Sequence, residues 1–174
     1  MTCKPFLRLL KLLPAFVVLL TLSGCGIYSL SGSNIDPKVK TFQVNYFQNT
    51  AEVVEPGIER TFTQRLQNLI QNQTNLSLTN SNGDLLYEGE ITEYRVTPMT
   101  ATASQTAAQN RLTISVMVRF TNKFKEDDNF EKRFSFYYDY AANELLTGGV
   151  LTTALEEIFE RITQDIFNES LAKW

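Results

Sequence analysis

Residues 112–120 read Leu-Thr-Ile-Ser-Val-Met-Val-Arg-Phe, with an apolar residue at every even position. This alternation has the period of a half-buried strand. Residues 133–140, Arg-Phe-Ser-Phe-Tyr-Tyr-Asp-Tyr, repeat it, and the acidic segment 125–129 between the two runs has the composition of a turn. We therefore expect an antiparallel hairpin whose core face is rich in aromatic side chains.

Three more strands are expected upstream of this hairpin. The first begins near Thr41, and a short one spans residues 76–79. Residues 81–84, Ser-Asn-Gly-Asp, have hairpin turn chemistry and lead into a third strand at 85–97. Its alternation slips between Ile91 and Tyr94, which predicts a β-bulge, and Pro98 either ends the strand or marks an edge.

Two amphipathic helices are expected, because apolar residues recur at intervals of three and four in two segments. The first follows Pro56 and carries Ile58, Phe62, Leu66, Leu69 and Ile70. The second begins around Gly149, runs nearly to Trp174 and carries Leu151, Leu155, Ile158, Phe159, Ile162 and Ile166.

The element order is therefore β-α-β-β-β-β-α, and each apolar stripe needs a sheet to cover. We predict an α+β two-layer sandwich, with a mostly antiparallel sheet of four to five strands and both helices on one face. The other face would carry Thr113, Ser115, Met117 and Arg119. Residues 100–109 are almost wholly Thr, Ala, Ser and Gln, which predicts a long mobile loop or a strand extension that could meet a partner.

The N-terminus has the pattern of a bacterial lipoprotein signal. Basic residues Lys4, Arg8 and Lys11 accompany an apolar stretch, residues 12–22, that is too short to span a membrane. Leu-Ser-Gly-Cys at 22–25 resembles a lipobox, which implies cleavage between Gly24 and Cys25 and lipid on Cys25. We expect a cleaved signal peptide at 1–24, a lipidated N-terminus and flexible linker at 25–40, and one α+β periplasmic domain at 41–174. Several acyl chains on one cysteine would suffice for stable membrane anchoring.

Composition excludes several classes of function. The chain has no histidine, which removes the usual triads and the commonest transition-metal ligand. Of its two cysteines, Cys3 leaves with the signal and Cys25 is acylated, so no thiol remains for catalysis or zinc. Loss of three basic residues with the signal changes the net charge from −3 to −6, which argues against nucleic acid as a partner. We expect no enzyme, no cofactor and no metal site.

The adjacent carboxylates are better explained as structure than as chemistry. Asp127 and Asp128 lie in the acidic turn, and Glu156 and Glu157 fall on the polar side of the second helix. The glycine pair at 148–149 is a flexible helix start more readily than an anion cradle.

The sequence resembles the lipopolysaccharide-assembly family LptE, in the form found in Bacteroidetes-type bacteria. Four features carry the resemblance, and none is a catalytic signature. They are the lipobox followed by Gly-Ile-Tyr-Ser-Leu-Ser-Gly at 26–32, Val-Asn-Tyr-Phe at 44–47 before an acidic Pro-Gly helix start, the stretch Asp-Leu-Leu-Tyr-Glu-Gly-Glu-Ile-Thr-Glu-Tyr at 84–94, and the ending from Ile166 to Trp174.

The resemblance implies two helices against a four-stranded sheet. It also implies an outer-membrane lipoprotein that faces the periplasm, partners the barrel LptD as a plug and scaffold, and assists insertion of lipopolysaccharide into the outer leaflet. A polar plug suits a polar barrel lumen, and basic strand residues could pair with lipid A phosphates. The candidates for such contacts are Arg95, Arg111 and Arg119. The alternative for each is an ordinary strand arginine that faces water.

A second function stays open. The segment 42–78 also resembles the opening of CsgG-type and LpoB-type lipoproteins, which secrete fibre subunits or activate cell-wall synthases. Copurification with a barrel or with a synthase would separate the two interpretations.

Overall fold

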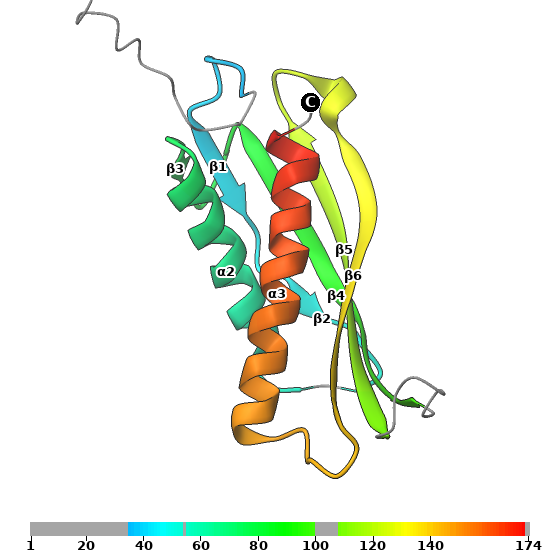
Figure 1. Ribbon diagram of the computed structural model, residues 1–174. Helices are drawn as coiled ribbons and strands as arrows, with labels where there is room; N and C mark the ends of the chain where they lie inside the picture. Colours follow the sequence, from blue (N-terminus) through cyan, green and yellow to red (C-terminus); the bar gives the residue numbers. More distant parts are fainter. Residues whose placement is uncertain (1–34, 54, 100–107, 173–174) are drawn as a thin grey trace, which may run out of the picture. The chain divides into compact units, whose positions relative to one another are not determined.

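The computed structural model describes residues 35–53, 55–99 and 108–172. The chain divides into Met1–Gly32 and Ser33–Trp174, and all described residues belong to the second unit. Figure 1 shows its elements, which follow the order β1 (Thr41–Val44), β2 (Gln48–Asn49), α2 (Ile58–Gln73), β3 (Ser77–Leu78), β4 (Leu85–Met99), β5 (Gln109–Asn122), a 3-10 turn (Glu126–Asp128), β6 (Phe130–Ala141) and α3 (Gly148–Leu171).

The strands form a single sheet with the order β3-β1-β4-β5-β6, and β2 pairs separately with β4. The expected hairpin is confirmed, because β5 pairs antiparallel with β6, as it does with β4. β1 pairs in parallel with β3 and β4, and β2 pairs in parallel with β4. The predicted α+β class is confirmed. The sheet has six strands, one above the expected range, because the two residues of β2 are too few to show a periodicity.

The turn at residues 81–84 does not form the hairpin that its composition predicts. β1 lies between β3 and β4, so the two strands that flank this turn do not pair with each other. Asn82 has the left-handed φ of 54° that such turns favour. The Asp84 carboxylate accepts the backbone N–H groups of Lys40 at 2.8 Å and Thr41 at 2.9 Å. The turn therefore fastens the start of β1 instead of joining β3 to β4.

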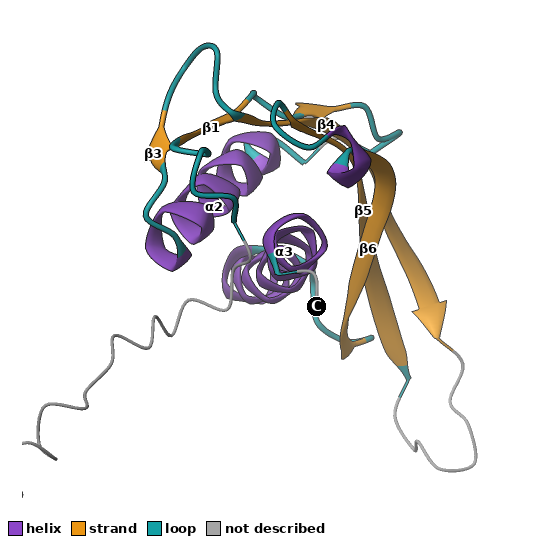
Figure 2. Cartoon of the chain, turned by 90° about the horizontal axis from the view of Figure 1, so that it is seen from above, coloured by secondary structure: helices purple, strands orange, loops and turns teal. Residues whose placement is uncertain are grey.

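Both helices lie on one face of the sheet, as expected, and Figure 2 shows this two-layer arrangement from above. α2 packs near β1, β2 and β3, while α3 covers β5 and β6. The stripe predicted for α2 is largely buried, with Ile58, Phe62, Leu66 and Ile70 at 2% exposure or less. The Phe62 ring meets Phe159 of α3 edge-on at 5.3 Å between centroids, so the helices share one core.

A buried hydrogen bond ties the end of α3 to the sheet. The Tyr87 side chain of β4 is fully buried, and its hydroxyl donates to Ser170 Oγ at 2.9 Å. Ser170 in turn donates to the carbonyl of Ile166 at 2.7 Å. Burial raises the pKa of Tyr87 far above its usual value, so this hydroxyl stays a donor at any physiological pH.

The predicted bulge in β4 is confirmed. Ile91 pairs with Val116 and Glu93 pairs with the next residue, Ser115, so Thr92 is the additional residue. Pro98 does not end the strand, because β4 continues to Met99. Within the described residues, nothing pairs with 93–99 on the side away from β5, so Pro98 sits at a sheet edge as expected.

Gly89 marks a close approach of backbone and ring in β4. A Cβ atom built there would lie 2.1 Å from the carbonyl oxygen of Met117 and 2.6 Å from the Phe47 ring. Phe47 is fully buried and also packs on Phe62 at 5.0 Å between centroids. The missing side chain therefore lets the segment between β1 and β2 pack tightly on the sheet.

Candidate functional site

The face of the sheet opposite the helices carries the polar and charged side chains of β4, β5 and β6. Strand alternation places them there, and the pairing register brings them into cross-strand rows. Three rows are hydrogen-bonded from β5 to β6 through their side chains: Arg119 with Glu131, Ser115 with Ser135, and Arg111 with Asp139. We call this surface the outer face.

The bulge decides where Glu93 points. Without the extra residue Thr92, strict alternation would send Glu93 to the same face as the buried Ile91. The register shift instead pairs Glu93 with Ser115, on the outer face. Its carboxylate then joins three strands, because its partners come from β4, β5 and β6.

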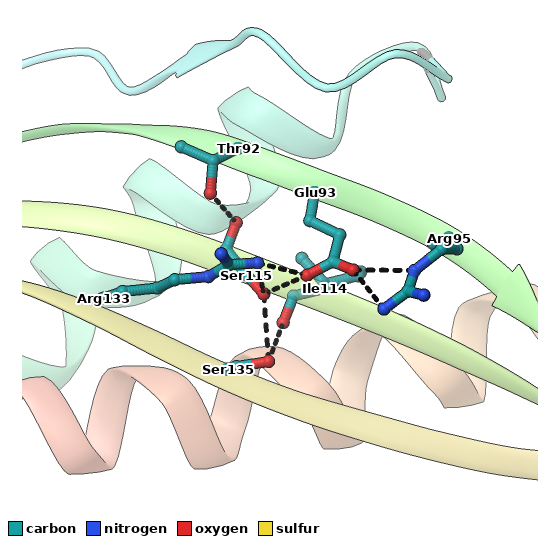
Figure 3. Close-up of polar contacts among 7 residues, drawn as sticks. All are labelled: Thr92, Glu93, Arg95, Ile114, Ser115, Arg133 and Ser135. Atoms are coloured by element: carbon teal, nitrogen blue, oxygen red, sulfur yellow. Dashed lines mark hydrogen bonds and ion pairs between the residues drawn. The ribbon is translucent and has the colours of Figure 1, made fainter.

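Figure 3 shows the network around this carboxylate. Glu93 Oε1 accepts from Arg95 Nε at 2.8 Å and Nη2 at 2.6 Å. Glu93 Oε2 accepts the Ser115 hydroxyl at 2.7 Å and forms an ion pair with Arg133. The Ser115 hydroxyl bond, together with Arg95 and Arg133, holds the pKa of Glu93 below its usual value.

Ser115 is fully buried beneath these charges, yet the arrangement is unsuited to nucleophilic chemistry. Its hydroxyl also accepts from Arg133 Nη2 at 3.0 Å and lies 3.0 Å from Ser135 Oγ. A general base needs a pKa near the operating pH, and that of Glu93 is lowered instead. The geometry favours a fixed polar surface.

Two further pairs continue the outer face. Arg111 forms a two-bonded pair with Asp139, at 2.7 and 2.8 Å, and its guanidinium stacks 3.6 Å from the Tyr137 ring centroid. Arg119 binds Glu131 through Nε at 3.2 Å and Nη2 at 3.1 Å. Exposed ion pairs contribute only about 0 to 1 kcal/mol each. The Arg119–Glu131 pair, in which both side chains are more than half exposed, therefore adds little to stability.

The structure places all three predicted arginines on this one face and gives each a carboxylate partner. Arg95 and Arg119 keep 64% and 58% of their side chains exposed, whereas Arg111 keeps 29%. Sequence reasoning missed Arg133 and the partners Glu93, Glu131 and Asp139. The alternation of β6 could have placed three of them on the outer face. Residues 131, 133 and 139 are odd-numbered, whereas the buried aromatic residues of this strand are even-numbered.

The other residues singled out in the sequence either have a structural role or lie outside the described residues. Asp128 pairs with Lys125 at 2.9 Å in the 3-10 turn, and Glu156 and Glu157 are exposed on α3. Gln109 begins β5, while residues 100–107 of the predicted loop lie outside the described residues. Gly24 and Cys25, the predicted cleavage and lipid sites, lie outside them as well.

The described part of the chain contains neither a metal-binding cluster nor a helix that could span a membrane. No group of three or more His, Cys, Asp or Glu side chains there could hold a metal ion. Neither α2 nor α3 is long and apolar enough to cross a membrane.

Comparison with known proteins gives one family match. The model of the family described as "LptE: Lipopolysaccharide-assembly" matches residues 39–170. No curated protein matches the sequence significantly.

Solved structures of similar shape have little sequence in common with the chain. A hypothetical protein from Chlamydia trachomatis aligns at 10% identity and a TM-score of 0.52, over 78% of this chain and 99% of its own. Uncharacterized lipoprotein B from Nitrosomonas europaea aligns at 12% identity and a TM-score of 0.48, over 82% of this chain and 87% of its own. A PelC dodecamer subunit from Paraburkholderia phytofirmans aligns at 8% identity and a TM-score of 0.48, over 80% of this chain and 95% of its own. The first likeness supports the fold alone.

Proposed function

Since the chain belongs to the lipopolysaccharide-assembly family LptE, we propose that it acts as a lipid-anchored plug and scaffold for an outer-membrane β-barrel of the LptD type. In this proposal the chain is cleaved between Gly24 and Cys25 and acylated on Cys25. The domain faces the periplasm and works by binding, with no covalent step.

The observation that carries the proposal is the contrast between the two faces of the sheet. One face is covered by α2 and α3, and the other carries paired charges from three strands. The lumen of a large membrane barrel is lined by polar side chains and water. A sheet surface made of ion pairs and hydroxyls matches such a lining, whereas an apolar surface would not.

Arg95 and Arg119 are the better candidates for contact with lipid phosphates. Each is more than half exposed and bound to one carboxylate, so donor N–H groups remain for an anion. Arg111 is less suited, because Asp139 engages it twice and Tyr137 covers its plane. Arg133 joins the candidates, since it lies beside Arg95 across the shared Glu93.

The test of the partner is affinity purification of the tagged, acylated full chain from detergent-solubilised outer membranes, with mass spectrometry of what binds. A stoichiometric large β-barrel is expected. A secretion pore or a cell-wall synthase in its place would overturn the proposal in favour of the CsgG-like or LpoB-like alternative.

The test of the anchor is separate. The Cys25→Ser variant should incorporate no labelled palmitate and should leave the membrane fraction, while the unchanged chain does both. Equal labelling of the two chains would contradict lipid attachment at Cys25.

A further inference from the structure

A small hollow lies on the outer face beside β2. It has a volume of about 230 Å³ and is lined by Gln48, Gly89, Glu90, Met117, Arg119 and Glu131. Sites for small-molecule ligands usually measure about 300 to 1,000 Å³. The hollow is therefore better matched to one long side chain than to a free ligand.

Glu90 stands apart from the other charges of this face. Glu88 accepts a hydrogen bond from Asn45, and the remaining acidic and basic side chains form ion pairs. Among the outward charged residues in the described parts of β4, β5 and β6, Glu90 alone makes no hydrogen bond or ion pair. Its cross-strand neighbours, Gln48 and Met117, carry no charge that could neutralise it.

The lining of the hollow matches a cation with a hydrocarbon stem. Arg119 is already bound to Glu131 through two nitrogens, which leaves the charge of Glu90 uncompensated. Gln48 offers an amide oxygen as a second acceptor. Met117 is a flexible apolar side chain that can pack along an aliphatic stem. Lysine and arginine combine such a stem with a charged donor group at its end.

We infer that this hollow receives a lysine or arginine side chain presented by the protein partner, with Glu90 as its counter-ion. The inference rests on the proposed function, in which that partner is the barrel and the basic residue points inward from its wall. It adds a specific contact, and it identifies the half-buried, unpaired Glu90 as the residue that recognises the partner. Leaving this carboxylate unpaired after docking would cost affinity, because the partner would remove the water around it.

The test places a photo-crosslinking amino acid at Thr121, two residues from Arg119 on the same face, in the full chain in cells. Crosslinked proteins are identified by mass spectrometry. The change Glu90→Gln should lower the adduct yield about tenfold, because a charge-assisted hydrogen bond is lost. The matched control is Glu157→Gln on the helical side, which should leave the yield unchanged. Equal thermal unfolding of the variants separates recognition from folding.

A charge exchange completes the test. The Glu90→Lys variant should lose the adduct, and a Lys→Glu or Arg→Glu change at a basic partner residue near the crosslink should restore it. A Glu90-dependent, exchangeable adduct with a different protein would keep the basic contact and overturn the barrel assignment. A barrel adduct that ignores both Glu90 variants would overturn this inference and leave the barrel partnership intact. No protein adduct at all would also overturn it.

Discussion

Gly89 illustrates how a single missing side chain fixes local packing. Because a Cβ atom would lie 2.1 Å from a backbone oxygen of β5, Gly89→Ala must shift the pairing of β4 with β5 or displace Phe47. We expect a loss of about 3 kcal/mol in the free energy of unfolding, at the upper end for overpacking. Urea denaturation followed by circular dichroism measures it.

Gly149 is the matched control, because nothing lies within 4 Å of a Cβ built there, in the first turn of α3. Gly149→Ala should leave stability unchanged or raise it by up to about 1 kcal/mol, since alanine favours a helix. Equal destabilisation by the two substitutions would show that the close approach at Gly89 does not matter.

Asp84 gives the fold a pH dependence that can be assigned to one carboxylate. The backbone N–H of Lys40 is the main cause that lowers the pKa of Asp84, and that of Thr41 assists. A lowered folded-state pKa contributes stability that is complete above the unfolded value of about 3.9 and lost as the pH falls through the folded value. Asp84→Asn should therefore cost about 1 kcal/mol at pH 7 in this partly exposed site.

Measurements at several pH values separate the effect of the Asp84 charge from that of the shape of its side chain. The difference in the free energy of unfolding between the wild-type chain and Asp84→Asn, measured by chemical denaturation, should shrink as the pH falls below about 3.9. If the difference is the same at pH 7 and pH 2, the carboxylate charge is not what fastens β1.

The bond between β4 and α3 predicts an asymmetry between its two ends. Tyr87→Phe removes the donor, and Ser170 keeps its own bond to the Ile166 carbonyl, so the cost should be about 1 kcal/mol. Ser170→Ala leaves the fully buried Tyr87 hydroxyl without an acceptor and should cost about 2 to 3 kcal/mol. Guanidinium denaturation of both variants measures the two losses.

The double variant provides the check. Since both changes act on one contact, Tyr87→Phe with Ser170→Ala should cost less than the sum of the single changes. Strict additivity, or a larger cost for Tyr87→Phe, would contradict a shared bond.

At the scale of whole elements, the sequence predicts what is local and misses what depends on distant partners. The strands at 112–120 and 133–140 pair as expected, because a short turn leaves them little choice. The turn at 81–84 looks equally favourable, yet β1, from about 40 residues upstream, takes the place beside β4. The composition of a turn indicates that the chain reverses there, but it does not indicate which strand will pair with the strand that follows.

The outer face shows the same limit. Alternation is enough to put Arg111 and Arg119 on one side, and the slip near Ile91 predicts the bulge that brings Arg95 there too. Their partners require the register between strands, which no local pattern contains. The alternation of β6 is enough to put Arg133 on this face, but its contact with the carboxylate that also binds Arg95 depends on that register.

At the scale of the whole domain, the two layers are joined through Phe62. Its ring contacts Phe47 from the sheet side and Phe159 of α3, and it is fully buried. Phe62→Ala should cost about 3 to 5 kcal/mol and lower the melting temperature by roughly 10 °C or more. Differential scanning calorimetry should show one cooperative transition at the lower temperature.

The exposed Gln64, two residues along the same helix, is the control. Gln64→Ala should change stability by no more than about 0.5 kcal/mol. If the Phe62 variant instead unfolds in two steps, the helices and the sheet do not share one core.

The position of β1 has a mechanical consequence. If the domain is held at its N-terminal side, a force on it is transmitted through Lys40, the residue before β1. Because β1 lies between β3 and β4 and is parallel to both, tension along the strand shears hydrogen bonds on two sides at once. An edge strand would instead peel away one bond at a time. A force on the N-terminal side of the domain would thus act on the strand that is hardest to pull out of the sheet.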